Sequence, residues 1–111
     1  MTLADSLAAY LRTVELSRSP RTHLAYAQAC RHFADLLRER KVPPETTEAA
    51  TLSTEWLGWF VTYLKTFAVA TEQLYLAALA GYYEFSVAES HSQVNLAAMR
   101  QLIKRRQRRA A

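Results

Sequence analysis

The sequence predicts an all-α fold with one domain, and three observations support this. Half of the 111 residues are hydrophobic, whereas the chain holds only two glycines and three prolines, a composition that favours helices. Apolar residues recur every three or four positions through most of the chain, which is the period of one helix face. A chain of this length buries about two thirds of the surface that it exposes when unfolded. We therefore expect a helical bundle around one core.

The first two predicted helices begin at good capping residues. Thr2 is a suitable N-cap for a helix that runs to about Leu16. The next helix extends to about Lys41, with Ser19 as its N-cap and Pro20 at its first position, where proline costs no hydrogen bond. The apolar stripe of the first helix comprises Leu3, Leu7, Tyr10, Leu11 and Val14.

The second helix has an apolar face and a basic face. Steps of three and four residues stack one set of side chains on the apolar face: Thr22, Tyr26, Cys30, Phe33 and Leu37. Roughly opposite lie Arg21, Gln28, Arg31 and Arg38. Because Cys30 is on the apolar face, we expect a buried, inert thiol rather than a disulfide or a nucleophile.

Two further helices occupy the middle of the chain. After two prolines and a polar connection to Thr51, Ser53 caps a third helix that should finish near Phe67. Thr71 caps the fourth helix, whose apolar residues fall on two sides. A helix that is apolar on two sides is expected to be central and largely buried.

The end of the chain is basic. A loop over residues 86–92 precedes a fifth helix, for which Asn95 is the predicted cap. The net charge is +4, to which residues 18–41 contribute +4 and residues 100–111 contribute +6, while residues 1–17 contribute −1 and residues 42–99 contribute −5. Two interpretations of the basic end remain open: a solvated tail, or an arm that contacts phosphates.

The sequence carries no recognisable catalytic or metal-binding pattern. His23 and His32 are nine residues apart on one helix and so point to opposite sides, and His91 stands alone. Gly58 and Gly81 are isolated, so no glycine-rich phosphate loop is present. We expect no cofactor, no metal and no catalytic activity in this fragment.

No stretch of the chain resembles a membrane-spanning or targeting segment. A membrane span needs about 18 or more apolar residues with few charges, and none occurs. The N-terminus also lacks the basic and apolar regions of a signal peptide. We therefore expect a soluble, cytoplasmic protein with no membrane partner.

Two residue patterns in register indicate a family. The first comprises Ser19, Thr22, Tyr26, Cys30, Phe33 and Leu37, and the second comprises Thr71, Leu76, Leu79, Tyr82 and Tyr83. The helix between them is matched by Leu52, Trp56, Phe60 and Leu64. With these residues the chain resembles, over nearly its whole length, the N-terminal core-binding domain of the tyrosine recombinases, the phage-integrase family.

The resemblance implies an orthogonal four- to five-helix SAM-like bundle that forms half of a clamp around double-stranded DNA during DNA integration and recombination. Residues 1–99 would be the core-binding helical domain. Residues 100–111 would be the basic last helix and the start of a linker to a catalytic domain that this chain lacks. The other implied partners are further protomers of the recombinase in a synaptic assembly, and the isolated fragment would be monomeric.

The resemblance also implies which residues face DNA, since in this family the second and fourth helices do so. The expected contacts are Arg21, Thr22, Gln28 and Arg31 on the second helix, Lys65 before the fourth, Thr71, Gln73 and Tyr75 on the fourth, and Arg100, Lys104 and Arg105 on the last. Thr22 lies on the apolar stripe as well, where a structural role is favoured. The alternative function is a helical protein-interaction domain with a basic C-terminal tail, which would dock a partner through Leu24, Leu74 or Phe85.

Overall fold

Five α-helices and two short 3-10 turns make up the protein in the computed structural model, which describes the backbone of residues 1–110 and the side chains of residues 1–107. The helices are α1 (Leu3–Ser17), α2 (Pro20–Glu39), α3 (Thr54–Tyr63), α4 (Val69–Ala88) and α5 (Leu96–Ala110), and the turns are η1 (Ala49–Thr51) and η2 (Leu64–Thr66). The described residues form no strand, so the all-α prediction is confirmed. Among these helices, none combines the length and the apolarity needed to cross a lipid bilayer.

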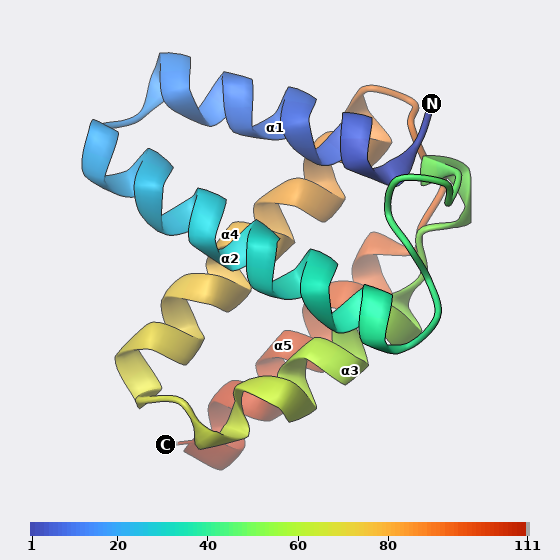
Figure 1. Ribbon diagram of the computed structural model, residues 1–111. Helices are drawn as coiled ribbons and strands as arrows, with labels where there is room; N and C mark the ends of the chain where they lie inside the picture. The colour runs from blue at the N-terminus through green and yellow to red at the C-terminus, as the bar shows by residue number, and fades with distance from the viewer. Residues whose placement is uncertain (111) are drawn as a thin grey trace.

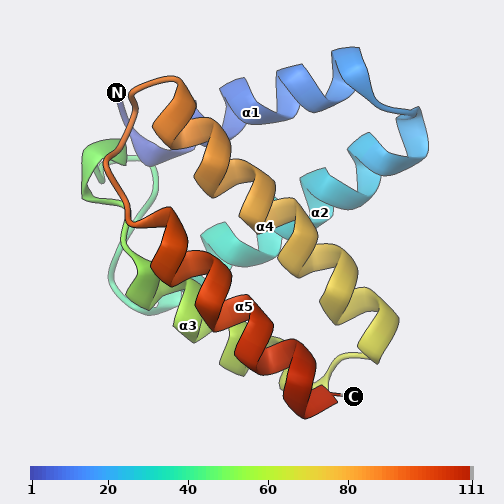
Figure 2. The same ribbon diagram turned by 180° about the vertical axis from the view of Figure 1, so that it is seen from behind.

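The helices α3 and α4 lie between α2 and α5. One side of this pair contacts α2, the other side contacts α5, and α1 packs against α2 and α4. In Figure 1, α2 is toward the viewer. The opposite view in Figure 2 brings α5 to the front. The two basic helices therefore lie on opposite sides of the molecule.

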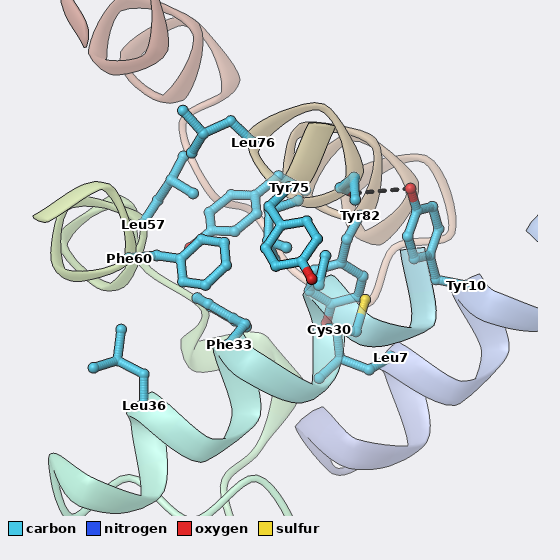
Figure 3. Packing of buried hydrophobic residues seen from close by; sticks show 14 of the residues in the cluster. Leu7, Tyr10, Cys30, Phe33, Leu36, Leu57, Phe60, Tyr75, Leu76 and Tyr82 are labelled. Carbon is cyan, nitrogen blue, oxygen red and sulfur yellow. Dashed lines mark hydrogen bonds between the residues drawn. The ribbon is translucent and has the colours of Figure 1, made fainter. Parts of the chain in front are cut away.

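The core is centred on α4, as its apolar residues on two sides predict. The buried residues of this helix are Glu72, Tyr75, Leu76, Ala78, Leu79, Tyr82, Tyr83 and Ser86. Figure 3 shows Phe33 of α2 meeting Phe60 of α3 beside this helix, with their ring centroids 5.5 Å apart in an edge-on arrangement. Such a geometry is the favourable one for aromatic pairs.

The apolar stripe predicted on α2 is also confirmed over most of its length. Cys30, Phe33 and Leu37 are buried, whereas Thr22 and Tyr26 are half-buried toward the end of α2 that projects from the body in Figure 1. Cys30 is a free thiol, and burial raises its pKa to about 12. The thiolate that reacts with electrophiles is therefore disfavoured at neutral pH.

Three predicted helix caps are confirmed. In each, a side-chain oxygen accepts a hydrogen bond from the backbone N–H three residues further on, which satisfies a group that the helix itself leaves unpaired. These bonds run from Asp5 N to Thr2 Oγ1 (3.1 Å), from Thr22 N to Ser19 Oγ (3.2 Å) and from Ala98 N to Asn95 Oδ1 (3.0 Å).

Of the two other predicted caps, Ser53 is confirmed in position only, and Thr71 is wrong. Ser53 stands at the N-cap position of α3 but makes no capping bond, and its buried Oγ has no partner among the described residues. Thr71 lies inside the first turn of α4, which begins at Val69 after Ala68. The cap position of α4 therefore lies three residues before the predicted one, just after α3 has given way to η2 at Leu64.

Two helices also end at other residues than predicted. α2 ends at Glu39 rather than near Lys41, because Lys41 has a positive φ of 66° and cannot continue a right-handed helix. α4 extends to Ala88, past the predicted loop start at Ser86. Ser86 is buried within the helix, where its hydroxyl donates a 2.7 Å hydrogen bond to the carbonyl of Tyr83.

The packing of α1 against α4 depends on a glycine. The Tyr10 hydroxyl donates a 2.8 Å hydrogen bond to the carbonyl of Ala78, and Tyr10 is buried. This places the phenol directly over Gly81, where an added Cβ would overlap the hydroxyl oxygen and lie 3.3 Å from Cζ. Gly81 therefore provides the room that the tyrosine occupies.

We expect Gly81→Ala to destabilise the protein by up to about 2 kcal/mol, because overpacking costs about 1–3 kcal/mol and the helix-propensity gain of alanine returns about 1 kcal/mol. In the background of Tyr10→Phe, which lacks the overlapping oxygen, the same substitution should be neutral or stabilising. Urea unfolding of the four proteins measures both effects. Equal destabilisation in the two backgrounds would contradict the proposed overlap.

Candidate nucleic-acid interface

The outward side of α2 carries what we call the α2 basic face, made of Arg21, Gln28 and Arg31. The two arginines are exposed and Gln28 is half-buried. Because these residues follow one another at steps of seven and three, they share a helix side. Ten residues separate the arginines, which corresponds to about 15 Å along the helix axis.

The arginines of the α2 basic face are free of ion pairs with other described residues, unlike their neighbour Arg38. The Arg38 guanidinium lies 2.6 Å from the Asp35 carboxylate and also binds Glu45, with Nε donating over 3.0 Å. This hydrogen bond holds the pKa of Glu45 below its ordinary value. The uncompensated charge of the face therefore resides in Arg21 and Arg31.

Thr22 has a structural part in the α2 cap. Its backbone N–H donates to Ser19 Oγ, and the Ser19 hydroxyl donates to Thr22 Oγ1 over 3.1 Å. This pairing agrees with the structural role favoured for Thr22 by the sequence, although the partner is a hydroxyl of the cap rather than a backbone carbonyl.

The three candidates on α4 lie in different surroundings. Gln73 is exposed and Thr71 is half-buried. Tyr75 is only 8% exposed, with its ring 5.4 Å from that of His32 and 6.1 Å from that of Phe67. Tyr75 therefore belongs mainly to the core and offers little surface to a ligand.

The sequence assigned no role at the site to a histidine and a tyrosine that lie beside the α2 basic face. His32 follows Gln28 by one helical turn, and its Nδ1 is 2.7 Å from the hydroxyl of Tyr63, which ends α3. Burial raises the pKa of Tyr63, with a smaller effect from Glu39. The pair fixes α2 against α3 and so sets how the α2 basic face is presented.

The other cationic candidates gather around α5. We call Lys65, Lys104 and Arg105 the α5 basic face. All three are exposed, and Lys65 and Arg105 line the same groove of about 270 Å³ between α3 and α5. Arg100 lies 3.7 Å from Glu84 of α4, so its charge is partly compensated.

A buried ion pair anchors α5. Arg106 donates to both carboxylate oxygens of Glu72, over 2.6 and 3.2 Å, and Glu72 is 2% exposed. Glu72 lies in the first turn of α4, where the helix dipole favours a negative charge. The basic run of the sequence thus contains one arginine that is part of the packed body, joined to a residue 34 positions away that no local pattern indicates.

Protein-family models, curated proteins and solved structures offer no match to this chain. Within the described part of the chain, no three His, Cys, Asp or Glu side chains are grouped so that they would hold a metal ion. The features of the described residues that bear on function are the two basic faces and the residues that position them.

Proposed function

We propose that this chain is a DNA-binding domain of the core-binding type found in tyrosine recombinases, and that the α2 basic face contacts phosphates of double-stranded DNA. One observation carries the proposal: Arg21 and Arg31 are exposed and form no ion pair with other described residues, while Arg38 on the same helix is neutralised. Arginines without internal partners are the groups that replace counterions along a DNA backbone.

The resemblance of the sequence to the core-binding domains supports the same surface. It implies a SAM-like bundle in which the second and fourth helices face DNA, and α2 and Gln73 of α4 expose polar side chains. Gln28 lies between the two arginines and is long enough to reach a base edge once they hold the backbone. In this proposal the domain works in the cytoplasm beside other protomers, and strand cleavage belongs to a separate catalytic domain.

We expect Arg21→Ala and Arg31→Ala each to weaken duplex binding at all sequences, and to reduce the slope of log affinity against log salt by about 1. The reason is that each variant removes one phosphate contact. Fluorescence anisotropy with a short duplex, titrated at several salt concentrations, measures the slope.

The matched control is Arg40→Gln, which removes the same charge from the end of the same helix. Arg40 lies over the ring of Trp59, 4.6 Å from its centroid, and so is outside the α2 basic face. The slope of log affinity against log salt for Arg40→Gln should stay close to that of the wild type. Absence of duplex binding by the wild type even at low salt would refute the proposed function. Equal losses of duplex affinity in Arg21→Ala, Arg31→Ala and Arg40→Gln would refute the α2 basic face as the DNA-binding surface.

A second candidate function is supported by one apolar residue. Leu24 lies within the same outward side of α2 and is 59% exposed, which would suit a helical protein-interaction domain. Leu24→Ser should abolish such an interaction while leaving the salt slope of duplex binding unchanged.

A further inference from the structure

We propose that the α5 basic face is a second duplex-binding surface, so that one copy of the domain holds two DNA segments at once, on opposite sides. This inference rests on the proposed function, because it takes the α2 basic face as the surface for the first segment. It assigns to Lys65, Lys104 and Arg105 a role separate from that of Arg21 and Arg31.

Of the five helices, α5 has the charge that best suits binding to a polyanion. Residues 96–110 contain six arginines and lysines and no acidic residue, whereas α2 includes Asp35 and Glu39. Among the described residues, Lys65, Lys104 and Arg105 take part in no ion pair or side-chain hydrogen bond. Their positive charge is therefore available to an outside partner with many negative charges.

The groove between α3 and α5 gives this charge a defined shape. Lys65 comes from η2 and Arg105 from α5, so two cations from separate elements converge on one groove, whose lining also includes Thr62. Its volume of about 270 Å³ is several times the roughly 30 Å³ that a water molecule occupies in the liquid. The groove has room for a hydrated phosphate group between the two cations.

The ion pair of Arg106 with Glu72 holds this surface in place. Arg106 lies next to Arg105 in the helix and donates two hydrogen bonds into the body at the start of α4. Met99, which lies on the inward face of the same helix, is fully buried. Because α5 is fixed at both points, the cations of the α5 basic face are held by a rigid element before a ligand arrives, which lowers the entropy cost of binding.

The placement of the two faces is what requires a second duplex. α3 and α4 separate α2 from α5 (Figures 1 and 2), and the molecule measures 37 × 30 × 26 Å. Duplex DNA has a persistence length of about 150 base pairs, so a short duplex held on α2 does not bend around the body to reach α5. Contacts on the α5 side therefore belong to another DNA segment.

A two-duplex capture assay tests the proposal. A biotinylated short duplex is immobilised, the wild-type protein is added, and a fluorescent duplex of different sequence is then supplied at low salt. We expect the protein to retain the fluorescent duplex. Lys65→Gln/Arg105→Gln should lower this retention about ten-fold, as expected for two lost phosphate contacts, while changing the affinity for a single duplex much less. The matched control is Arg12→Gln/Lys41→Gln, which removes two exposed charges outside both faces and should retain the capture.

Each outcome separates this inference from the proposed function. If the wild type binds the first duplex but captures no second one, the two-duplex inference is wrong and the proposed function stands; the α5 basic face is then a solvated surface or one for an acidic protein. If capture persists in Lys65→Gln/Arg105→Gln, the bridging arises from protein self-association and the inference is equally wrong. If Arg21→Gln/Arg31→Gln loses capture and also binds a single duplex more weakly, the result supports both the proposed function and the two-duplex inference.

Discussion

Replacing Arg106 by leucine is expected to lower the free energy of unfolding by about 3–5 kcal/mol, the cost of leaving a buried charge without its partner. Glu72 is 2% exposed and receives both of its side-chain hydrogen bonds from Arg106. The loss is large, because domains of this size are stable by only about 5–15 kcal/mol. Few positions outside the aromatic core should have an equal effect.

The double variant Glu72→Leu/Arg106→Leu provides the control for this prediction. Because replacing both members of a buried ion pair by apolar residues is often neutral or stabilising, the double variant should recover most of the loss. Urea unfolding followed by circular dichroism gives the four free energies of the cycle. A loss below about 1 kcal/mol for Arg106→Leu would show that solvent reaches Glu72 and that α5 is not anchored there.

Raising the pH from about 9 to about 11 is expected to bring the protein to cooperative unfolding, because four buried groups resist ionisation in the folded state. Burial raises the pKa of Cys30 from 9.0 to about 12 and that of Tyr82 from 10.0 to about 12. Burial likewise raises the pKa values of Tyr10 and Tyr83 above 10.0. In the unfolded chain these groups ionise at their ordinary values.

The sign of the effect follows from the direction of these shifts. A raised pKa means that the folded state keeps its protons, so the associated stability is complete below the ordinary pKa and is lost as the pH rises toward the folded value. At about pH 11 the loss amounts to about 3 kcal/mol from Cys30 and slightly more than about 1 kcal/mol from each of the three tyrosines. The total of roughly 7 kcal/mol is comparable to the whole stability of a small domain.

Urea unfolding at a series of alkaline pH values, together with the ultraviolet absorbance of tyrosinate, measures this prediction. The absorbance of the buried tyrosines should appear only as the helical signal is lost. Cys30→Ala serves as the control, because it removes one of the four groups and should flatten the decline in the free energy of unfolding. A stability that does not change between about pH 8 and pH 11 would contradict the assignment of these groups as buried and protonated.

Features that depend on neighbouring residues in the chain were predictable. The caps at Thr2, Ser19 and Asn95 follow from a side chain meeting an N–H three residues away, and the stripe through Cys30 and Phe33 follows from the period of one helix. These signals are local, so they do not depend on the rest of the fold. The central position of α4 was also predictable from its apolar sides.

Features that depend on distant residues were not predictable. The sequence placed the cap of α4 at Thr71, but α4 already begins at Val69, after the turn η2. Packing of the aromatic residues around this turn outweighs a weak capping preference. From the sequence, Arg106 is indistinguishable from the other cations of the basic run, because its partner Glu72 lies in another helix.

The sequence by itself determined that the protein is all-α, where its positive charge is concentrated along the chain, and which side of α2 is apolar. Only the tertiary structure decided that the basic side of α2 and the basic helix α5 lie on opposite sides of the body, with Arg38 and Arg106 already paired and Arg21, Arg31, Lys65 and Arg105 turned outward. The physical reason is that periodicity sets the faces of each helix, whereas burial of apolar surface between helices sets where those faces point.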